Sequence, residues 1–140
     1  MIRAFQDSDL DVVMSIWLSA NIGAHNFIDA EYWKRNFDTV KTMIPQAEVY
    51  VLENDYRIDG FIGAIGDYIA GIFVDSAARA CGIGSQLLDS VRKNREKLTL
   101  SVYQKNTAAV SFYLRRGFRI DAERIDPQTL ELEYTMSWEY

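Results

Sequence analysis

Two stretches in the first third of the chain carry apolar residues at the three- and four-residue intervals of an α-helix. The first stretch follows Ser8, which we expect to be its N-cap. Its apolar positions are Leu10, Val13, Met14, Trp17 and Leu18. The second stretch follows Asp29 as N-cap and stops at Pro45. Its apolar positions are Trp33, Phe37, Val40 and Ile44. With a short strand over residues 1–5, the pattern predicts one strand followed by two helices.

The rest of the chain alternates between strand patterns and helix patterns. Runs rich in β-branched and aromatic residues, separated by turn residues, predict strands over residues 49–53, 58–65, 68–74, 98–103, 118–125 and 130–138. One helix has its apolar face at Ile83, Leu87, Leu88 and Val91. Another begins at Asn106 as N-cap, reaches Arg116 and is ended by Gly117. This order predicts an α+β domain over residues 1–140, with a mixed central sheet of about six to seven strands and helices on both faces.

The composition excludes several classes of protein. Hydrophobic residues make up 49% of the 140 residues, which is ordinary for a globular domain with a real core. The net charge of -5 argues against a nucleic-acid partner and leaves room for a cationic one, such as an amine. Cys81 is the only cysteine, which excludes an internal disulfide and favours a reducing compartment. No stretch resembles a signal peptide or a membrane span. We therefore expect a cytoplasmic monomer or homodimer with no membrane partner.

The strand over residues 68–74, a turn containing Gly82 and Gly84, and the helix that follows form a candidate anion site. The first N–H groups of a helix have no partner within the helix, and the macrodipole adds partial positive charge there. Glycines let the backbone approach a phosphate with no side chain in between. We therefore interpret residues 79–85 as a phosphate cradle. The alternative is a turn whose two glycines serve only tight packing.

Two motifs taken together resemble those of the GNAT N-acetyltransferases. The first is Arg-x-x-Gly-x-Gly at residues 79–84, which is similar to the coenzyme A pyrophosphate loop of that family. The second is Asn-x-x-Ala-x-x-Phe-Tyr-x-x-x-Gly-Phe at residues 106–118, where every fixed position is present. The predicted order of elements is similar to the GNAT fold over essentially the whole chain. Shorter segments, such as Val-Tyr-Gln-Lys-Asn at 102–106, are similar to the short single-domain bacterial members.

The resemblance implies that acetyl-CoA binds as a co-substrate and that no metal takes part. Backbone groups at residues 80–85 would hold the pyrophosphate, and the strand backbone at 72–74 would pair with the pantetheine arm. Asn106 would touch pantetheine. Arg115 would reach the 3′-phosphate, unless it is only a solvated charge at a helix end. The implied cofactor-binding residues are Ile72, Phe73, Val74, Arg79, Ala80, Cys81, Gly82, Ile83, Gly84, Ser85, Asn106, Tyr113 and Arg115.

Tyr113 is the candidate general acid. A thiolate leaves in the implied reaction, and a nearby phenol, with an ordinary pKa of ~10, carries the proton that the thiolate needs. The alternative is a core tyrosine with a satisfied hydroxyl. The general base is less clear, because Ser101 stands where many family members have Glu. A water relay to Asp67, Asp75 or His25 is one interpretation, and binding of the small neutral fraction of the amine is another.

His25 is the only histidine and lies in the segment expected on the acceptor side. Its ordinary pKa suits a base or an acceptor-binding group. The alternative is a loop histidine hydrogen-bonded to the backbone. The resemblance as a whole implies direct transfer of acetyl from acetyl-CoA to a primary amine in a ternary complex. The amine would belong to a protein lysine, a protein N-terminus or a small molecule. The alternative function is an acyl-CoA-binding module with little or no turnover.

Overall fold

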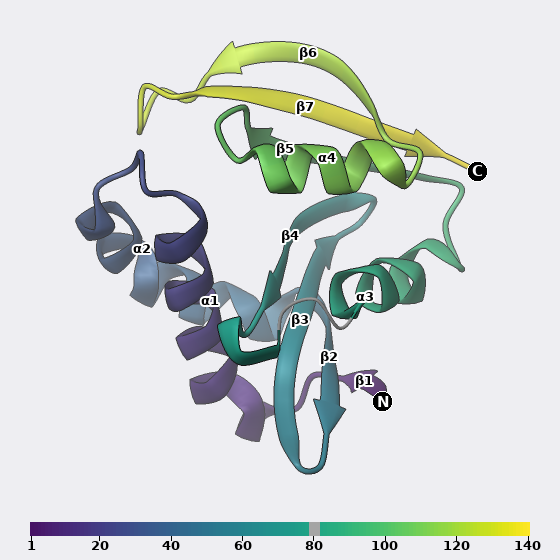
Figure 1. The fold of residues 1–140 in the computed structure, drawn as a ribbon. Helices are drawn as coiled ribbons and strands as arrows, with labels where there is room; N and C mark the ends of the chain where they lie inside the picture. Colours follow the sequence, from purple (N-terminus) through teal and green to yellow (C-terminus); the bar gives the residue numbers. More distant parts are fainter. Residues whose placement is uncertain (79–81) are drawn as a thin grey trace.

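Seven strands form one mixed sheet in the order β1-β2-β3-β4-β5-β7-β6 (Figure 1). This computed structural model describes residues 1–78 and 82–140. The strands are β1 (Ile2–Ala4), β2 (Glu48–Asn54), β3 (Arg57–Ile65), β4 (Tyr68–Val74), β5 (Lys97–Tyr103), β6 (Arg119–Ile125) and β7 (Leu132–Glu139). The helices are α1 (Leu10–Ala24), α2 (Ala30–Met43), α3 (Ile83–Arg92) and α4 (Thr107–Arg115). The predicted α+β architecture with a mixed sheet is confirmed.

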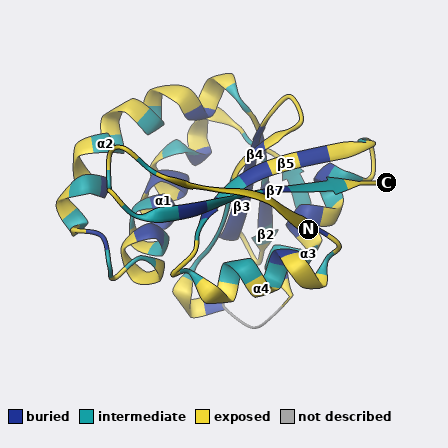
Figure 2. Cartoon of the chain, turned by 90° about the horizontal axis from the view of Figure 1, so that it is seen from above, coloured by how far each residue is buried: buried dark blue, intermediate teal, exposed yellow. Residues whose placement is uncertain are grey.

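Each face of the sheet has its own hydrophobic core, because successive side chains along a strand point to opposite faces. On β3, Ile62 packs with residues of α3 and α4, whereas Phe61 packs with residues of α1 and α2. Figure 1 shows α3 and α4 together on the near face. Figure 2 shows that buried residues are concentrated on the strands and the inner helix faces. Helices therefore cover both faces, as predicted.

The start of α1 differs from the prediction that Ser8 is its N-cap. Ser8 lies within a short 3-10 helix over Asp7–Asp9, and α1 begins at Leu10. Asp9 is buried, and its carboxylate accepts hydrogen bonds from Arg3 at 2.8 and 3.0 Å and from the Gln6 N–H at 2.8 Å. Because the Arg3 guanidinium donates to it, the pKa of Asp9 lies below its usual value. This tie between β1 and the 3-10 turn delays the start of the helix.

The start of the last strand was also predicted too early, at Leu130. That residue has φ of 61° and is 76% exposed, and β7 begins at Leu132. Backbone hydrogen bonds from Leu130 N–H to Asp126 O, and from Asp126 N–H to Glu131 O, close the β6–β7 loop. Leu130 therefore belongs to the turn. Its hydrophobic side chain continued the alternating pattern only by coincidence.

No helix among residues 1–78 and 82–140 is long and apolar enough to cross a membrane.

Candidate active site

Strands β4 and β5 run parallel but pair over only two positions, Tyr68 with Thr99 and Ile69 with Leu100. Beyond these pairs the two strands separate. A bulge in the β3–β4 pairing lies beside this point, where the register shifts between Gly63 and Ala64. We call the opening between residues 70–74 of β4 and 101–103 of β5 the seam. Since an unpaired strand edge presents free N–H and C=O groups, the seam can pair with an extended ligand.

A cavity of about 450 Å³ lies on the α3/α4 face of the seam. Its described walls come from β4, the start of α3 and the inner face of α4. They are Ile72, Val74, Ala78, Gly82, Ile83, Gly84, Ser85, Ala108, Ala109, Phe112, Tyr113 and Arg116. Gly82 is the N-cap of α3 with φ of 70°, a conformation that favours glycine. The N-terminal turn of α3 therefore opens into the cavity, as an anion site requires.

Arg116 places a positive charge beside this helix N-terminus. Its Nε donates to Ser85 Oγ at 2.7 Å, and Nη2 also bonds that oxygen. The guanidinium carbon lies 4.1 Å from the centre of the Phe112 ring. Sequence reasoning missed Arg116 and proposed its neighbour Arg115. The spacing gave a signal, because Ala109, Phe112, Tyr113 and Arg116 share one helix face.

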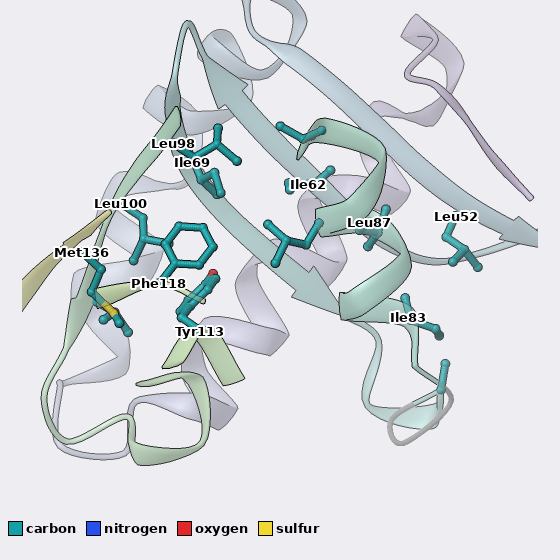
Figure 3. Packing of buried hydrophobic residues seen from close by; sticks show 14 residues of the cluster. Leu52, Ile62, Ile69, Ile83, Leu87, Leu98, Leu100, Tyr113, Phe118 and Met136 are labelled. Atoms are coloured by element: carbon teal, nitrogen blue, oxygen red, sulfur yellow. The ribbon is translucent and has the colours of Figure 1, made fainter. Parts of the chain in front are cut away.

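Tyr113 extends from α4 toward the sheet (Figure 3). The side chain is 7% exposed and makes edge-on contacts with Phe112 and Phe118, at ring distances of 5.3 and 5.4 Å. Burial, with a smaller contribution from Tyr68, raises the pKa of Tyr113 above its ordinary value. Among the described residues its hydroxyl has no hydrogen-bond partner. A protonated donor therefore borders the cavity.

A second cavity, of about 210 Å³, lies on the α1/α2 side of the seam. Its walls are rich in aromatic residues and include Trp17, Asn21, His25, Trp33, Ala70, Gly71, Ile72, Phe73, Ser101, Val102, Tyr103 and Asn106. Ile72 lines both cavities. The two spaces therefore meet at the seam, where two bound molecules can approach each other from opposite faces of the sheet.

His25 is held on all sides in this second cavity. Its ring stacks on Trp33 at 5.0 Å, and Phe27 and Tyr103 contact it edge-on at 5.6 and 5.4 Å. Nδ1 lies 3.0 Å from Asn21 O, and Nε2 lies 3.2 Å from Asn106 Nδ2. Burial lowers the pKa of His25 below its ordinary value. Both ring nitrogens are already engaged in hydrogen bonds within the protein.

Tyr103 connects the second cavity to the β6–β7 loop. Its hydroxyl donates to Asp126 Oδ2 at 2.7 Å. Burial, followed by this hydrogen bond, raises the pKa of Tyr103. Burial opposes ionisation of Asp126, but hydrogen bonds from Tyr103 and the Gln128 N–H hold its pKa below the usual value. An ionised carboxylate therefore stands beside the aromatic walls.

The predicted site residues divide between the two cavities. Ile72 lines both. The α3/α4 cavity alone is lined by Val74, Gly82, Ile83, Gly84, Ser85 and Tyr113, and the other alone by Phe73, His25 and Asn106. Arg115 is exposed and lines neither cavity. Arg79, Ala80 and Cys81 lie outside the described residues.

The candidate bases are less well placed. Ser101 lines the second cavity, as expected for its strand position, and none of the described residues around that cavity carries a carboxylate. Asp67 lies 3.8 Å from Arg95, and Asp75 accepts from the Ala77 N–H at 3.0 Å. Neither aspartate lines the two cavities.

Comparisons with known proteins agree with this fold. A model of the acetyltransferase (GNAT) domain family matches residues 45–120. The chain is 34% identical to the peptidyl-lysine N-acetyltransferase YiaC of Escherichia coli K12, covering 99% of this chain and 96% of that one. It is 29% identical to the peptidyl-lysine N-acetyltransferase YjaB of the same organism, covering 85% and 82%. The solution structure of apo YjaB from Escherichia coli superposes with a TM-score of 0.86 and 26% identity, covering 99% and 96%.

Proposed function

The chain belongs to the GNAT acetyltransferase family, and from this premise we propose that it moves the acetyl group of acetyl-CoA to the side-chain amine of lysine in proteins. Acetyl-CoA is the co-substrate, and the reaction is an N-acetyl transfer. The observation that carries the proposal is the seam. It joins a cavity suited to a phosphate-bearing cofactor to an aromatic cavity on the opposite face, through the shared residue Ile72.

The residues around the first cavity fit coenzyme A. The N-terminal turn of α3 and Arg116 suit its pyrophosphate, because both offer N–H donors to an anion. The open edge of β4 at Ile72 to Val74 suits the pantetheine arm, whose amides can pair with a strand. We retain the prediction that Asn106 contacts pantetheine, because its side-chain oxygen has a second lone pair available. These assignments lead the acetyl group to the seam.

The proposed reaction is a direct transfer. The amine nitrogen forms a bond to the acetyl carbon, the carbon–sulfur bond breaks, and Tyr113 Oη donates a proton to the sulfur. An N–H of β4 near Ile72 stabilises the oxyanion that develops on the acetyl oxygen. The amine nitrogen releases one proton to water on the other side of the seam, and the Tyr113 oxygen regains a proton from water before the next turnover. Burial raises the pKa of Tyr113, which keeps the hydroxyl protonated at neutral pH but also makes it a weaker acid than a free phenol.

The lysine acceptor is supported by the similarity to YiaC and YjaB, both named peptidyl-lysine N-acetyltransferases, and by the charge beside the second cavity. Asp126, held by Tyr103, attracts a cationic side chain toward the aromatic walls. Since no carboxylate lines this cavity among the described residues, we propose that the small neutral fraction of the amine is the species that reacts. We also propose a cytoplasmic location, in keeping with the single cysteine.

Acetyl transfer to defined acceptors tests the proposal. The purified chain and acetyl-CoA are incubated with a lysine peptide blocked at its N-terminus, with a peptide that has a free N-terminus and no lysine, and with spermidine. Thiol release and mass spectrometry follow the products. We expect acetylation of the lysine peptide, lost with Tyr113→Phe.

Two other results would redirect the assignment. Transfer only to the free N-terminus or to spermidine would overturn the lysine proposal. Saturable acetyl-CoA binding with no transfer to any amine would favour the acyl-CoA-binding module, for which the serine at position 101 is the supporting feature.

A further inference from the structure

Asn106 lines the second cavity, and its side-chain amide links His25 to the first turn of α4. It is the N-cap of α4, and its Oδ1 accepts from the Ala109 N–H at 3.3 Å. This bond fixes the orientation of the amide, because the reversed amide would place a donor against the N–H. Asn106 Nδ2 therefore faces His25 Nε2, at 3.2 Å.

The orientation of Asn106 determines where the proton of His25 lies. An amide nitrogen only donates, so His25 Nε2 must be an unprotonated acceptor. The single ring proton then lies on Nδ1, which donates to Asn21 O at 3.0 Å. A neutral ring with its proton on Nδ1 satisfies every one of these atoms. A charged ring would place the Nε2 proton against the Nδ2 donor.

The surroundings of His25 favour the same neutral form. Its ring contacts the aromatic rings of Phe27, Trp33 and Tyr103. Among the described residues, two charged groups contact these rings: Asp126, which is bonded to the Tyr103 hydroxyl, and Lys105, which lies 5.6 Å from the Phe27 ring centre. One carries a negative charge and the other a positive charge. Burial, not either of these charges, is the main reason that the pKa of His25 is lowered.

We propose that His25 is a positioning residue whose neutral, Nδ1-protonated ring ties the end of α1 to the N-cap of α4. Helix α4 carries Tyr113, so the tie fixes the acid on one side of the seam relative to the acceptor cavity on the other. In this role His25 takes no proton from the substrate. Protonation of the ring breaks the bond to Asn106 and loosens α4 at its first turn.

The tautomer is measured directly by nitrogen NMR of the imidazole. His25 is the only histidine, so one set of ring resonances reports on it alone. We expect a protonated Nδ1 and an unprotonated Nε2 at pH 7, with titration only below the ordinary pKa of about 6.5. A proton on Nε2, or a charged ring at pH 7, would overturn the proposal.

The variant Asn106→Asp should reverse the pH dependence of the stability that His25 contributes. A carboxylate accepts from both the Ala109 N–H and a protonated Nε2, so the pKa of His25 moves from below about 6.5 to above it. In the wild type, the stability contributed by the neutral ring is complete above about 6.5 and falls as the pH drops toward the lowered pKa. In the variant, the contribution of the ion pair is complete below about 6.5 and falls as the pH rises through the raised pKa.

We therefore expect the melting temperature of Asn106→Asp, relative to the wild type, to rise as the pH falls from 8 to 5.5. Asn94→Asp makes the same change of charge at an exposed position and should leave the titration of His25 unchanged. An unchanged His25 pKa in Asn106→Asp would contradict the tie.

Turnover separates positioning from base catalysis, and this part of the test rests on the proposed function. His25→Gln keeps an acceptor for Asn106 but has no titrating group. We therefore expect kcat to fall by only about threefold, a smaller effect than the loss of one hydrogen bond would produce. His25→Leu removes the acceptor and should lower kcat by about tenfold or more. A drop of about 10²–10⁴ in both variants would identify a base instead. Absence of acetyl transfer in the wild type would defeat the proposed function but leave the NMR and stability results intact.

Discussion

At the scale of single residues, Tyr113 is the group whose removal should stop the reaction with the least damage to the fold. Tyr113→Phe deletes only a hydroxyl that has no partner among the described residues, so the free energy of unfolding should change little. We expect kcat to fall by roughly 10²–10⁴, since the thiolate loses its proton donor. Steady-state kinetics and thermal melts measure both effects. Tyr134→Phe is the control, because its exposed hydroxyl accepts a hydrogen bond from Gln104. A comparable loss of kcat in that variant would argue against a specific acid.

The pH dependence of the reaction follows from the two ionisable partners at the seam. The raised pKa of Tyr113 keeps the acid protonated well above pH 9. Below the lysine pKa of ~10.4, the neutral fraction of the amine increases about tenfold for each unit by which the pH rises. We therefore expect kcat/KM for a lysine peptide to rise about tenfold per unit between pH 7 and 9. A plateau in this range would show that a protein base, not the free amine equilibrium, supplies the neutral nucleophile.

Arg115 and Arg116 are adjacent in sequence, but we expect them to contact different parts of acetyl-CoA. Arg116 lines the cofactor cavity beside Ser85, so Arg116→Ala should raise the KM for acetyl-CoA by about tenfold, as expected for a charge-assisted contact. The predicted role of Arg115 concerns the 3′-phosphate alone. Arg115→Ala should therefore weaken acetyl-CoA binding and leave binding of the 3′-dephospho analogue unchanged. Equal effects of both variants on both ligands would remove the distinction between them.

Local spacing limits what the sequence can predict about these residues. The motif predicted that Tyr113 belongs to the site. The helical spacing could also have predicted Arg116, because it lies on the same helix face as Tyr113. The bond between His25 and Asn106 joins residues 81 positions apart. No periodicity in a single sequence reports such a contact, because it depends on how α1 and α4 are arranged around the sheet.

At the scale of elements, the approach of α3 to β3 depends on Gly60. A Cβ there would lie 2.9 Å from Phe73 O and 3.0 Å from Ile83 Cγ2. We expect Gly60→Ala to destabilise the protein by about 1–3 kcal/mol through overpacking. Gly63 on the same strand is the matched control, since its nearest neighbours would lie at 3.9 and 4.0 Å. Denaturant unfolding compares the two, and equal stability would mean that α3 adjusts freely on the sheet.

The elements themselves were predicted best where period and cap agree. Asp29 caps α2 by accepting from the Glu31 N–H at 2.9 Å, and Asn106 caps α4, both as predicted. The errors occurred at Ser8 and Leu130, where contacts beyond the local pattern decide the conformation. Arg3 holds Asp9 from a neighbouring strand, and hydrogen bonds across the loop turn Leu130 out of β7.

At the scale of the whole molecule, the sheet consists of two parts that meet at β4 and β5. The sequence patterns predicted the strands and their order along the chain, but not which strands are neighbours in the sheet. The placement of β7 between β5 and β6, and the separation of β4 from β5, are properties of the assembled sheet. Only the resemblance to the GNAT family predicted that the backbone at residues 72–74 pairs with pantetheine, and this pairing stays a prediction.

Cofactor binding at the seam should bring the two parts of the sheet together. Beyond Ile69, the edge of β4 that faces β5 has no partner among the strands that the structure describes. An extended ligand that pairs with residues 70–74 slows amide exchange there, because opening of those hydrogen bonds then requires release of the ligand. We expect hydrogen–deuterium exchange to show protection of peptides covering 70–74 and 101–106 when coenzyme A is added. The β2–β3 turn near Asp55 serves as an internal control that should not change.

The same measurement separates binding from chemistry. Tyr113→Phe should keep the protection of β4, because its hydroxyl acts on the sulfur and not on the pantetheine amides. Gly82→Asp should lose it, because a carboxylate at the N-cap of α3 repels the pyrophosphate, and φ of 70° at that position adds strain. Protection confined to α3 in the wild type, without β4, would mean that the phosphates bind while the arm lies elsewhere. The open edge of β4 would then have to be explained by something other than coenzyme A.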